Sequence, residues 1–452
     1  MATALPDVET PAAETVAPYL ADFERLLARL PDEPAAVRAL RRSAIERFAA
    51  LGFPTLRQEE WRLTNVAPIA RGRFHRPAAA DEISADMAAV VPYAFDAAAR
   101  LVFVDGRFAP RLSDLGGLPP GVVAGSLAEA LDRTPDLVVP WLGQYARFDQ
   151  QPFTALNTAF LRDGAFLFVP RGTVVAGVVQ LLFLGSGDAG GATVSYPRNL
   201  LIAGEHSQVT IVETYAGHGP YFTCPVTEVV AGPSSVIDHY KVQRESRDAF
   251  HMATFQIQAE AASAFSSHSI SIGGAIVRND VNAVLDGEGI DCILNGLYLA
   301  EGRQLVDNHM RVEHAKPHCS SHELYKGILD GKARSVFNGL IHVHRGAQKT
   351  DAKQSNRNLL LSREAVANSN PQLEIFADDV RCTHGSTVGQ LDEDAVFYLR
   401  SRGIGEAAAR SLLTYAFASD VVARIKVEPV RRDLEEFLFS RLPQGEIVRQ
   451  AV

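Results

Sequence analysis

The central part of the chain alternates short apolar runs with turn residues. Between residues 165 and 345, runs rich in Val, Ile, Leu and Thr follow one another, and nearly every run is bounded by Gly, Pro, Asn, Asp or Ser. No stretch in this range shows the 3.6-residue period of an amphipathic helix. The pattern therefore predicts a long region built of strands and turns.

A four-residue signature recurs in this region, and its spacing predicts how the strands are arranged. The segments 201–204 (LIAG) and 229–232 (VVAG) begin 28 residues apart, and related segments begin at 257 and 284. A repeat of this length without an intervening helix predicts a solenoid of stacked β-coils, because one coil cannot bury its apolar face alone. The residues expected at its turns are Gly204, Gly232, Gly287 and Gly331.

A β-sandwich or jelly roll is the alternative arrangement of the same strands. In that architecture the dipeptides Asn295-Gly296 and Asp330-Gly331 would be tight hairpin turns between antiparallel strands. The repeat favours the solenoid over this alternative.

Helical periodicity flanks the β-rich region on both sides. Apolar residues recur at spacings of three and four from Tyr19 onward, and again within 35–51. Near the other end, helices are expected at 392–403, 405–425 and 430–442. The resulting division is a disordered tail (1–18), an N-terminal helical subdomain (19–100), a β-helix core (101–390, with regular coils from about 165) and a C-terminal helical subdomain (391–452).

Composition narrows the classes of function. The 452 residues carry a net charge of −9, so a large basic face for nucleic acid or an anionic membrane is not expected. The first twenty residues contain three acidic and no basic residues, unlike a secretory or transit signal, and no apolar run is long enough to span a membrane. The four cysteines form no CxxC pair, which fits a reducing cytoplasm.

The sequence lacks the motifs of common nucleotide-driven and hydrolytic enzymes. The segment 327–332 (GILDGK) resembles a P-loop, but only three residues separate its glycines and Ala333 follows the lysine. No GxSxG, HExxH or GxGxxG motif is present. A carbohydrate-acting β-helix enzyme would need clustered carboxylates along one sheet, and none is evident. These absences weigh against the common nucleotide-driven and hydrolytic mechanisms and leave open an enzyme built from dispersed residues.

Histidines gather in two places. One group, with Cys319 among its members, consists of His309, His314, His318 and His322. The other is the pair His342 and His344. Residues two or four apart in a strand share a face, so His318 with His322, and His342 with His344, are candidate metal ligands. The alternative is that they are ordinary surface residues. A stand-alone iron-storage or zinc-binding protein is the corresponding rival function.

Cys382 and His384 form a second candidate metal site. In an extended segment the thiol and the imidazole share one face, and together they suit iron or an iron–sulfur cluster. Two ligands cannot close such a site, so a partner chain would have to supply the remainder. A buried structural cysteine is the alternative.

Long runs of the sequence also carry a family resemblance. The clearest are FNGLIHVHRGAQKTDAKQSNRNLLLS (337–362), PQLEIFADDVRCTHGSTVGQLDEDAVFYLRSRGI (371–404) and HELYKGIL (322–329), with shorter ones at 59–65, 154–160 and 197–208. On these runs the chain resembles the SufB/SufD family of iron–sulfur cluster assembly scaffold proteins from about residue 20 to 440. The segment 354–357 (QSNR) lacks the cysteine expected in the SufB branch, and 383–385 (THG) lacks its Glu-His-Glu-like stretch. Both departures favour the SufD branch.

The resemblance implies a fold, partners and a site. The implied fold is a right-handed parallel β-helix flanked by helical subdomains. A SufB-like paralogue would pair with the β-helix, and a SufC-like ATPase would dock on the C-terminal helices. Two copies of the isolated chain would form a homodimer. The resemblance also implies that Cys382 and His384 face the SufB interface and contribute to a shared, transient iron or cluster site. A reduced flavin is associated with such complexes, but no residue pattern in this sequence locates it.

Overall fold

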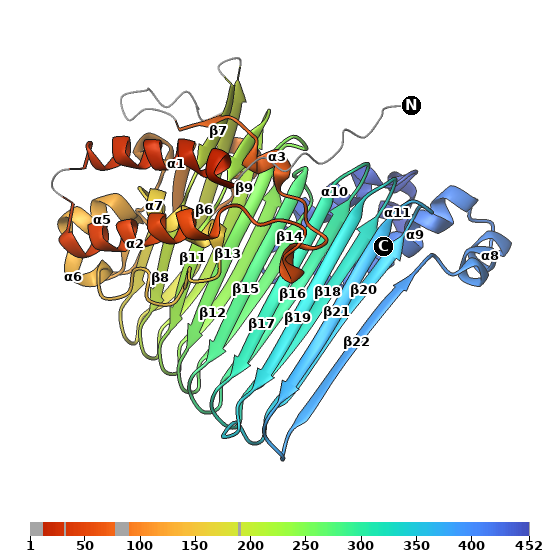
Figure 1. Ribbon diagram of the computed structural model, residues 1–452. Helices are drawn as coiled ribbons and strands as arrows, with labels where there is room; N and C mark the ends of the chain where they lie inside the picture. Colours follow the sequence, from red (N-terminus) through yellow and green to blue (C-terminus); the bar gives the residue numbers. More distant parts are fainter. Residues whose placement is uncertain (1–11, 31–32, 77–89, 189–190, 452) are drawn as a thin grey trace.

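The chain forms a parallel β-solenoid of about seven turns, flanked by helices at both ends of the sequence (Figure 1). The computed structural model describes residues 12–30, 33–76, 90–188 and 191–451. Strands make up 41% of the structure, and the long strands of successive coils pair in parallel. The predicted β-helix is therefore confirmed. The sandwich alternative is wrong, and Asn295-Gly296 lies inside strand β16 (Asp291–Ala300) instead of at a turn.

Each coil contributes one strand to each of two sheets, here called sheet A and sheet B. The main strands of sheet A are β5 (Ala165–Val169), β8 (Arg198–Ala203), β11 (Val226–Ala231), β13 (Phe250–Ala259), β15 (Ile276–Leu285), β17 (Leu305–His314), β19 (Arg334–Val343) and β21 (Val366–Ile375). Those of sheet B are β2 (Ala99–Val104), β6 (Val174–Asp188), β9 (Gln208–His218), β12 (Val236–Arg244), β14 (Ala264–Ser271), β16, β18 (Ser320–Leu329), β20 (Asp351–Leu360) and β22 (Arg381–Gly389). Shorter strands are β1 (Phe74–His75), β3 (Arg107–Phe108), β4 (Val123–Ser126), β7 (Gly191–Ser195) and β10 (Tyr221–Thr223).

The register of sheet A explains the sequence repeat. Leu201 is aligned with Val229, and Val229 with Ile257, which reproduces the spacing of 28. Ile257 is then aligned with Ala283, so the segment that was expected to begin at 284 is displaced by one residue. The coil length varies because the turns between strands differ in length, whereas the strands stay in register.

The glycines expected at the turns lie there. Gly204, Gly232, Gly287 and Gly331 each follow directly, or within two residues, the end of a strand. At Gly287 an added Cβ would lie 2.1 Å from the backbone nitrogen of Ala261, so any side chain would push the adjacent coils apart. Glycine is required here by the close approach of two backbones.

The interior of the solenoid is built from residues that alternate along each strand. Phe103, Phe183 and Tyr215 occupy one column on successive strands of sheet B, with ring centroids 4.9 and 4.8 Å apart. Each buried aromatic ring removes a large apolar area from water, so such a column stabilises the stacking of coils. The same interior also holds polar side chains, which are described below.

Helices of the N-terminal half cover the first coils (Figure 1). Their bounds are α1 (Ala12–Leu27), α2 (Ala35–Leu51), η1 (Glu59–Trp61), α3 (Ala67–Ala70), η2 (Val91–Tyr93), η3 (Pro110–Leu112), α5 (Leu127–Arg133), α6 (Pro135–Val138) and α7 (Pro152–Phe160). Helix α1 begins seven residues before the expected start at Tyr19, and the rest of the tail assigned to 1–18 lies outside the described residues. Helices α5, α6 and α7 lie inside the range assigned to the β core.

The C-terminal helices are α8 (Glu393–Ser401), α9 (Glu406–Val422), α10 (Glu428–Arg441) and α11 (Gly445–Ala451). Three of them match the expected segments, and α11 follows them. Helices α9 and α10 pack their apolar residues on the outer face of sheet B, on a cluster that includes Tyr240, Ile270 and Ile328. Lys326 ties α9 to the sheet, because its Nζ lies 2.8 Å from the Asp420 carboxylate. Helix α8 projects away from this body (Figure 1).

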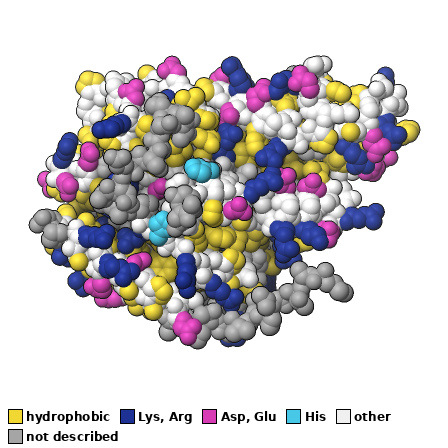
Figure 2. Space-filling view, turned by 90° about the horizontal axis from the view of Figure 1, so that it is seen from above, with side chains coloured by type: hydrophobic (Ala, Val, Ile, Leu, Met, Phe, Trp, Pro, Cys, Tyr) yellow, Lys and Arg dark blue, Asp and Glu magenta, His cyan; other side chains and the backbone are white. Residues whose placement is uncertain are grey.

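The surface seen from above carries basic and acidic side chains close together (Figure 2). Lys and Arg on this face do not form a continuous field, in agreement with the overall charge of −9. Within the described ranges, no helix has the length and apolar character needed to cross a membrane.

Candidate functional site

The last coil of the solenoid has an open edge. Among the described strands, β21 pairs only with β19 and β22 only with β20, and no strand follows β22 in Figure 1. Its exposed apolar side chains, with the exposed fraction of each residue, are Val366 (42%), Ile375 (39%), Phe376 (57%) and Val388 (48%). A row of unpaired backbone groups beside exposed apolar side chains is a template for pairing with another chain.

Strand β22 carries both candidate ligands on its interior side. Cys382 is aligned with the buried Ala352, and it packs against the small apolar cluster of the last coils. His384 is aligned with Gln354, which is also buried. Cys382 is half-buried and His384 is exposed, because no further coil closes the interior at this end. The structure therefore brings the two side chains to one face of an open edge.

The chemistry of this pair fits half of a metal site. Burial raises the pKa of the Cys382 thiol, and the Asp351 carboxylate adds to this effect, whereas a backbone hydrogen bond from Ala352 opposes it. The thiol is therefore protonated at neutral pH. In the part of the chain that the structure describes, no group of three or more His, Cys, Asp or Glu side chains is arranged to hold a metal ion. A closed site would need donors from another chain.

Two polar residues that sequence analysis did not single out lie behind the pair. The Gln354 Nε2 donates a hydrogen bond of 2.9 Å to Oε2 of Glu323 on the neighbouring strand β18. Burial raises the pKa of Glu323 to about 7, and the hydrogen bond from Gln354 opposes this rise only in part. Glu323 lies in the run HELYKGIL, but an alternating pattern does not tell which side of a strand faces the interior.

A second polar cluster lies deeper in the interior, on strands β9, β12 and β15. The His239 Nε2 is 3.0 Å from Glu213, and the Lys241 Nζ donates to the side chain of Asn279 at 2.8 Å. Burial alone would raise the pKa of Glu213, but His239 and Lys241 lower it to about 2. Burial lowers the pKa of Lys241 to about 8. Charges buried in this way must be paired to be tolerated.

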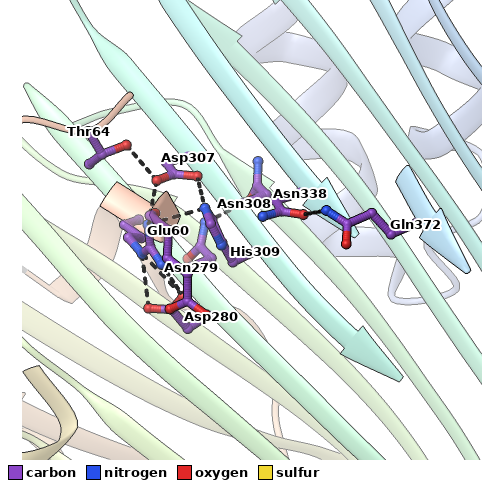
Figure 3. A network of polar contacts seen from close by, with 10 residues as sticks. Glu60, Thr64, Asn279, Asp280, Asp307, Asn308, His309, Asn338 and Gln372 are labelled. Carbon is purple, nitrogen blue, oxygen red and sulfur yellow. Dashed lines mark hydrogen bonds and ion pairs between the residues drawn. The ribbon is translucent and has the colours of Figure 1, made fainter. Parts of the chain in front are cut away.

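His309, from the first histidine group, belongs to a structural network (Figure 3). Its Nε2 lies 3.0 Å from Asp307, and the buried Arg278 donates to the same carboxylate at 2.8 Å. Thr64 also donates to Asp307, and the Arg278 guanidinium lies 3.7 Å from the ring centroid of Trp61. These contacts fix the segment around η1 on the outer face of sheet A, which gives His309 a structural role.

The other three histidines of that group point to different places. His314 is buried and forms a hydrogen bond of 2.8 Å with Ser321. His318 lies in a turn with φ of 60°, whereas His322 lies within β18. The expectation that His318 and His322 share a strand face is therefore wrong, because His318 precedes the strand. Cys319 is buried and its thiol donates to the Gly287 carbonyl at 3.1 Å.

His342 and His344 do lie side by side, as their spacing predicts. Their ring centroids are 4.8 Å apart, and each imidazole pairs with a glutamate. The His342 Nδ1 lies 2.8 Å from Glu374, and the His344 Nε2 lies 2.6 Å from Glu313. These pairs link successive coils of sheet A at its surface.

Comparison with known proteins agrees with the fold and with the sequence runs quoted above. Residues 183–417 match the family model described as "SUF system FeS cluster assembly, SufBD core domain", and residues 17–181 match the SufBD protein N-terminal region. An iron–sulfur cluster assembly SufBD family protein of Synechocystis is 33% identical over 89% of this chain and 90% of its own length. Iron–sulfur cluster assembly protein SufD of Escherichia coli is 32% identical over 89% and 92%, and that of Bacillus subtilis is 28% identical over 70% and 72%. The chain belongs to the SufBD family of iron–sulfur cluster assembly proteins, with SufD proteins among its relatives.

Proposed function

We propose that this chain is a non-catalytic scaffold subunit of a cluster assembly complex. It pairs with a SufB-type paralogue along the open edge of its solenoid and docks a SufC-type ATPase on its C-terminal helices. It works in the reducing cytoplasm, where its four free cysteines stay reduced. The iron or cluster is the cargo of the complex and is held only transiently.

The open edge of β21 and β22 is the observation that carries this proposal. Every other long strand from β8 to β20 is paired on both sides, so among these described strands β21 and β22 are the ones that offer backbone groups to a second solenoid. The exposed apolar side chains on this coil would become buried in such a pairing, which favours association.

The pair Cys382 and His384 gives this edge a chemical role. A thiol and an imidazole at the rim of the interior can supply two donors, and a partner edge supplies the others. A site divided between two chains forms only in the complex, which suits cargo that must later be released.

A proline substitution at the open edge tests the pairing. The Arg381 N–H donates to the Thr350 carbonyl, so alternation along β22 directs the Ser386 N–H toward the open side. Ser386→Pro removes that donor without breaking a bond to β20. We expect capture of the SufB-type partner to weaken about tenfold or more, equivalent to ~1.4 kcal/mol, with an unchanged thermal midpoint.

Ser386→Ala is the matched control, because it keeps the backbone donor and should bind the partner normally. Equal capture by both variants would place the interface elsewhere. The mass of each isolated variant in solution also reports the homodimer, which should dissociate in the proline variant if it uses the same edge.

The site is tested by His384→Ala in the complex. We expect cluster assembly to fail while partner capture changes by no more than ~1 kcal/mol, since one exposed imidazole contributes little to a broad interface. Cluster content is measured as iron and acid-labile sulfide, beside the thermal midpoint of the same sample. Normal cluster content at normal protein level would remove His384 from the function.

A further inference from the structure

A buried amide oxygen without a partner lies directly behind the edge pair. Gln354 is 2% exposed, and its Nε2 is used by Glu323. Its carbonyl oxygen Oε1 makes no hydrogen bond to any of the described residues. Burying an amide oxygen without a hydrogen bond costs free energy. A hydrogen-bond donor that reached this oxygen in the assembled metal site would therefore be favoured.

The orientation of this amide is set by its neighbours. The NH2 group of Gln354 donates to Oε2 of Glu323, so the carbonyl oxygen at the other corner of the amide is the atom left without a partner among the described residues. An added Cβ at Gly339 would lie 2.3 Å from the Gln354 Nε2. Gly339 on sheet A has no side chain, and the side chain of Gln354 fills the interior space that this leaves.

His384 is the next residue in the same column. Glu323, Gln354 and His384 are aligned on β18, β20 and β22, on the interior side of sheet B. Adjacent strands are about 4.8 Å apart, which brings side chains aligned in one column within hydrogen-bonding reach. An imidazole that binds a metal through one nitrogen commonly donates its other N–H to an oxygen, which fixes the ring.

We propose that Gln354 is a positioning residue for His384. In the complete site its side-chain carbonyl accepts a hydrogen bond from one imidazole N–H of His384, which leaves the other ring nitrogen directed at the cargo metal. Glu323 fixes the amide in the orientation that makes this possible. This inference rests on the proposed role of His384 in the shared site.

Metal binding by the complex with the SufB-type partner tests the inference, with Co²⁺ as a spectroscopic probe. Gln354→Met keeps the length of the side chain and removes its hydrogen-bonding groups. We expect Co²⁺ affinity to fall about 10- to 100-fold, as for the loss of other residues that orient metal ligands. Glu323→Gln should cause a smaller loss, because a second amide pairs with either end of Gln354.

Asn356→Leu is the matched control. Asn356 is an equally buried amide on the same strand, and it donates to Tyr298 and Tyr325 instead of lying beside His384. Its loss should lower the thermal midpoint and leave Co²⁺ affinity unchanged. In a His384→Ala background, Gln354→Met should cause no further loss of affinity.

The outcomes separate the inference from the proposed function. Normal Co²⁺ affinity in Gln354→Met, together with weakened affinity in His384→Ala, would overturn the positioning role and leave the shared site intact. Normal affinity in His384→Ala would overturn both. Additive losses in the double variant would show that Gln354 acts independently of His384 and would overturn the inference.

Discussion

At the scale of single residues, the interior of this solenoid departs from the rule that polar side chains face water. Glu213, Lys241 and Glu323 are buried on inward-facing positions, where a parallel solenoid ordinarily stacks apolar side chains. Each is tolerated only through specific partners, since an unpaired buried charge is strongly destabilising. The pairs near β12 are mutually compensating, whereas the hydrogen-bond partner of Glu323 among the described residues is the amide of Gln354.

Glu323 should therefore make stability depend on pH. Its pKa is raised from 4.5 to about 7 by burial, so the unfolded chain releases this proton at lower pH than the folded chain. The unfolding free energy falls as pH rises from about 4.5 to about 7. Above pH 7 the contribution of Glu323 to this free energy no longer changes with pH. Glu323→Gln should remove this slope, so that its stability relative to the parent increases by on the order of 3 kcal/mol across that range. Denaturant titrations of both proteins at pH 5, 6, 7 and 8 measure the difference; a difference that stays constant with pH would contradict the assignment.

At the scale of elements, the two helical regions relate differently to the β-solenoid. The N-terminal segment around η1 is held by the polar network of Arg278 and Asp307, whereas α9 and α10 bury an apolar patch on sheet B. Removing the whole tail would expose that patch, so a truncation would confuse loss of binding with loss of stability. Helix α8 is the element that can be altered without this problem.

Substitutions on α8 should separate ATPase docking from folding. Phe397 and Tyr398 are adjacent aromatic residues on α8, and their exposed fractions are 70% and 57%. The fold of the chain therefore does not depend on burying either side chain. Large exposed aromatic residues are typical of interface hot spots. We expect Phe397→Ala with Tyr398→Ala to weaken capture of the SufC-type ATPase at least tenfold, with an unchanged thermal midpoint. Leu56→Ala, at an exposed site (43%) on the N-terminal side, serves as the control; unchanged capture by the α8 variant would place docking on other helices.

At the scale of the whole molecule, the solenoid has one covered end and one open end. The first coils are enclosed by α1, α2 and α7, whereas the last coil ends in unpaired strands (Figure 1). This asymmetry favours pairing of two solenoids at one end only, which limits growth into longer fibres. The same geometry puts Cys382 and His384 on the open last coil, which is where the proposed shared site would lie.

Much of the fold was predictable from local pattern. The repeat of 28, the turn glycines and the return of helical period near residue 392 depend on neighbours in sequence, and the structure agrees with each. The spacing of Cys382 and His384 likewise determined that they share a face. The start of α1 and the placement of α5 to α7 were not predicted, because these helices depend on burial against the first coils.

Tertiary structure alone decided which side chains meet. Strand alternation divides residues into two sets, but only the stacking of coils determines which set faces the interior and which residues share a column. Glu323, Gln354 and His384 are 31 and 30 residues apart, and the unequal coil lengths hide this alignment in the sequence. His309 and His318 show the converse. They are close in the sequence and therefore appeared as one group, but the turn between β17 and β18 directs them to different surfaces. Register between coils is a property of the packed solenoid, and it decided the candidate site.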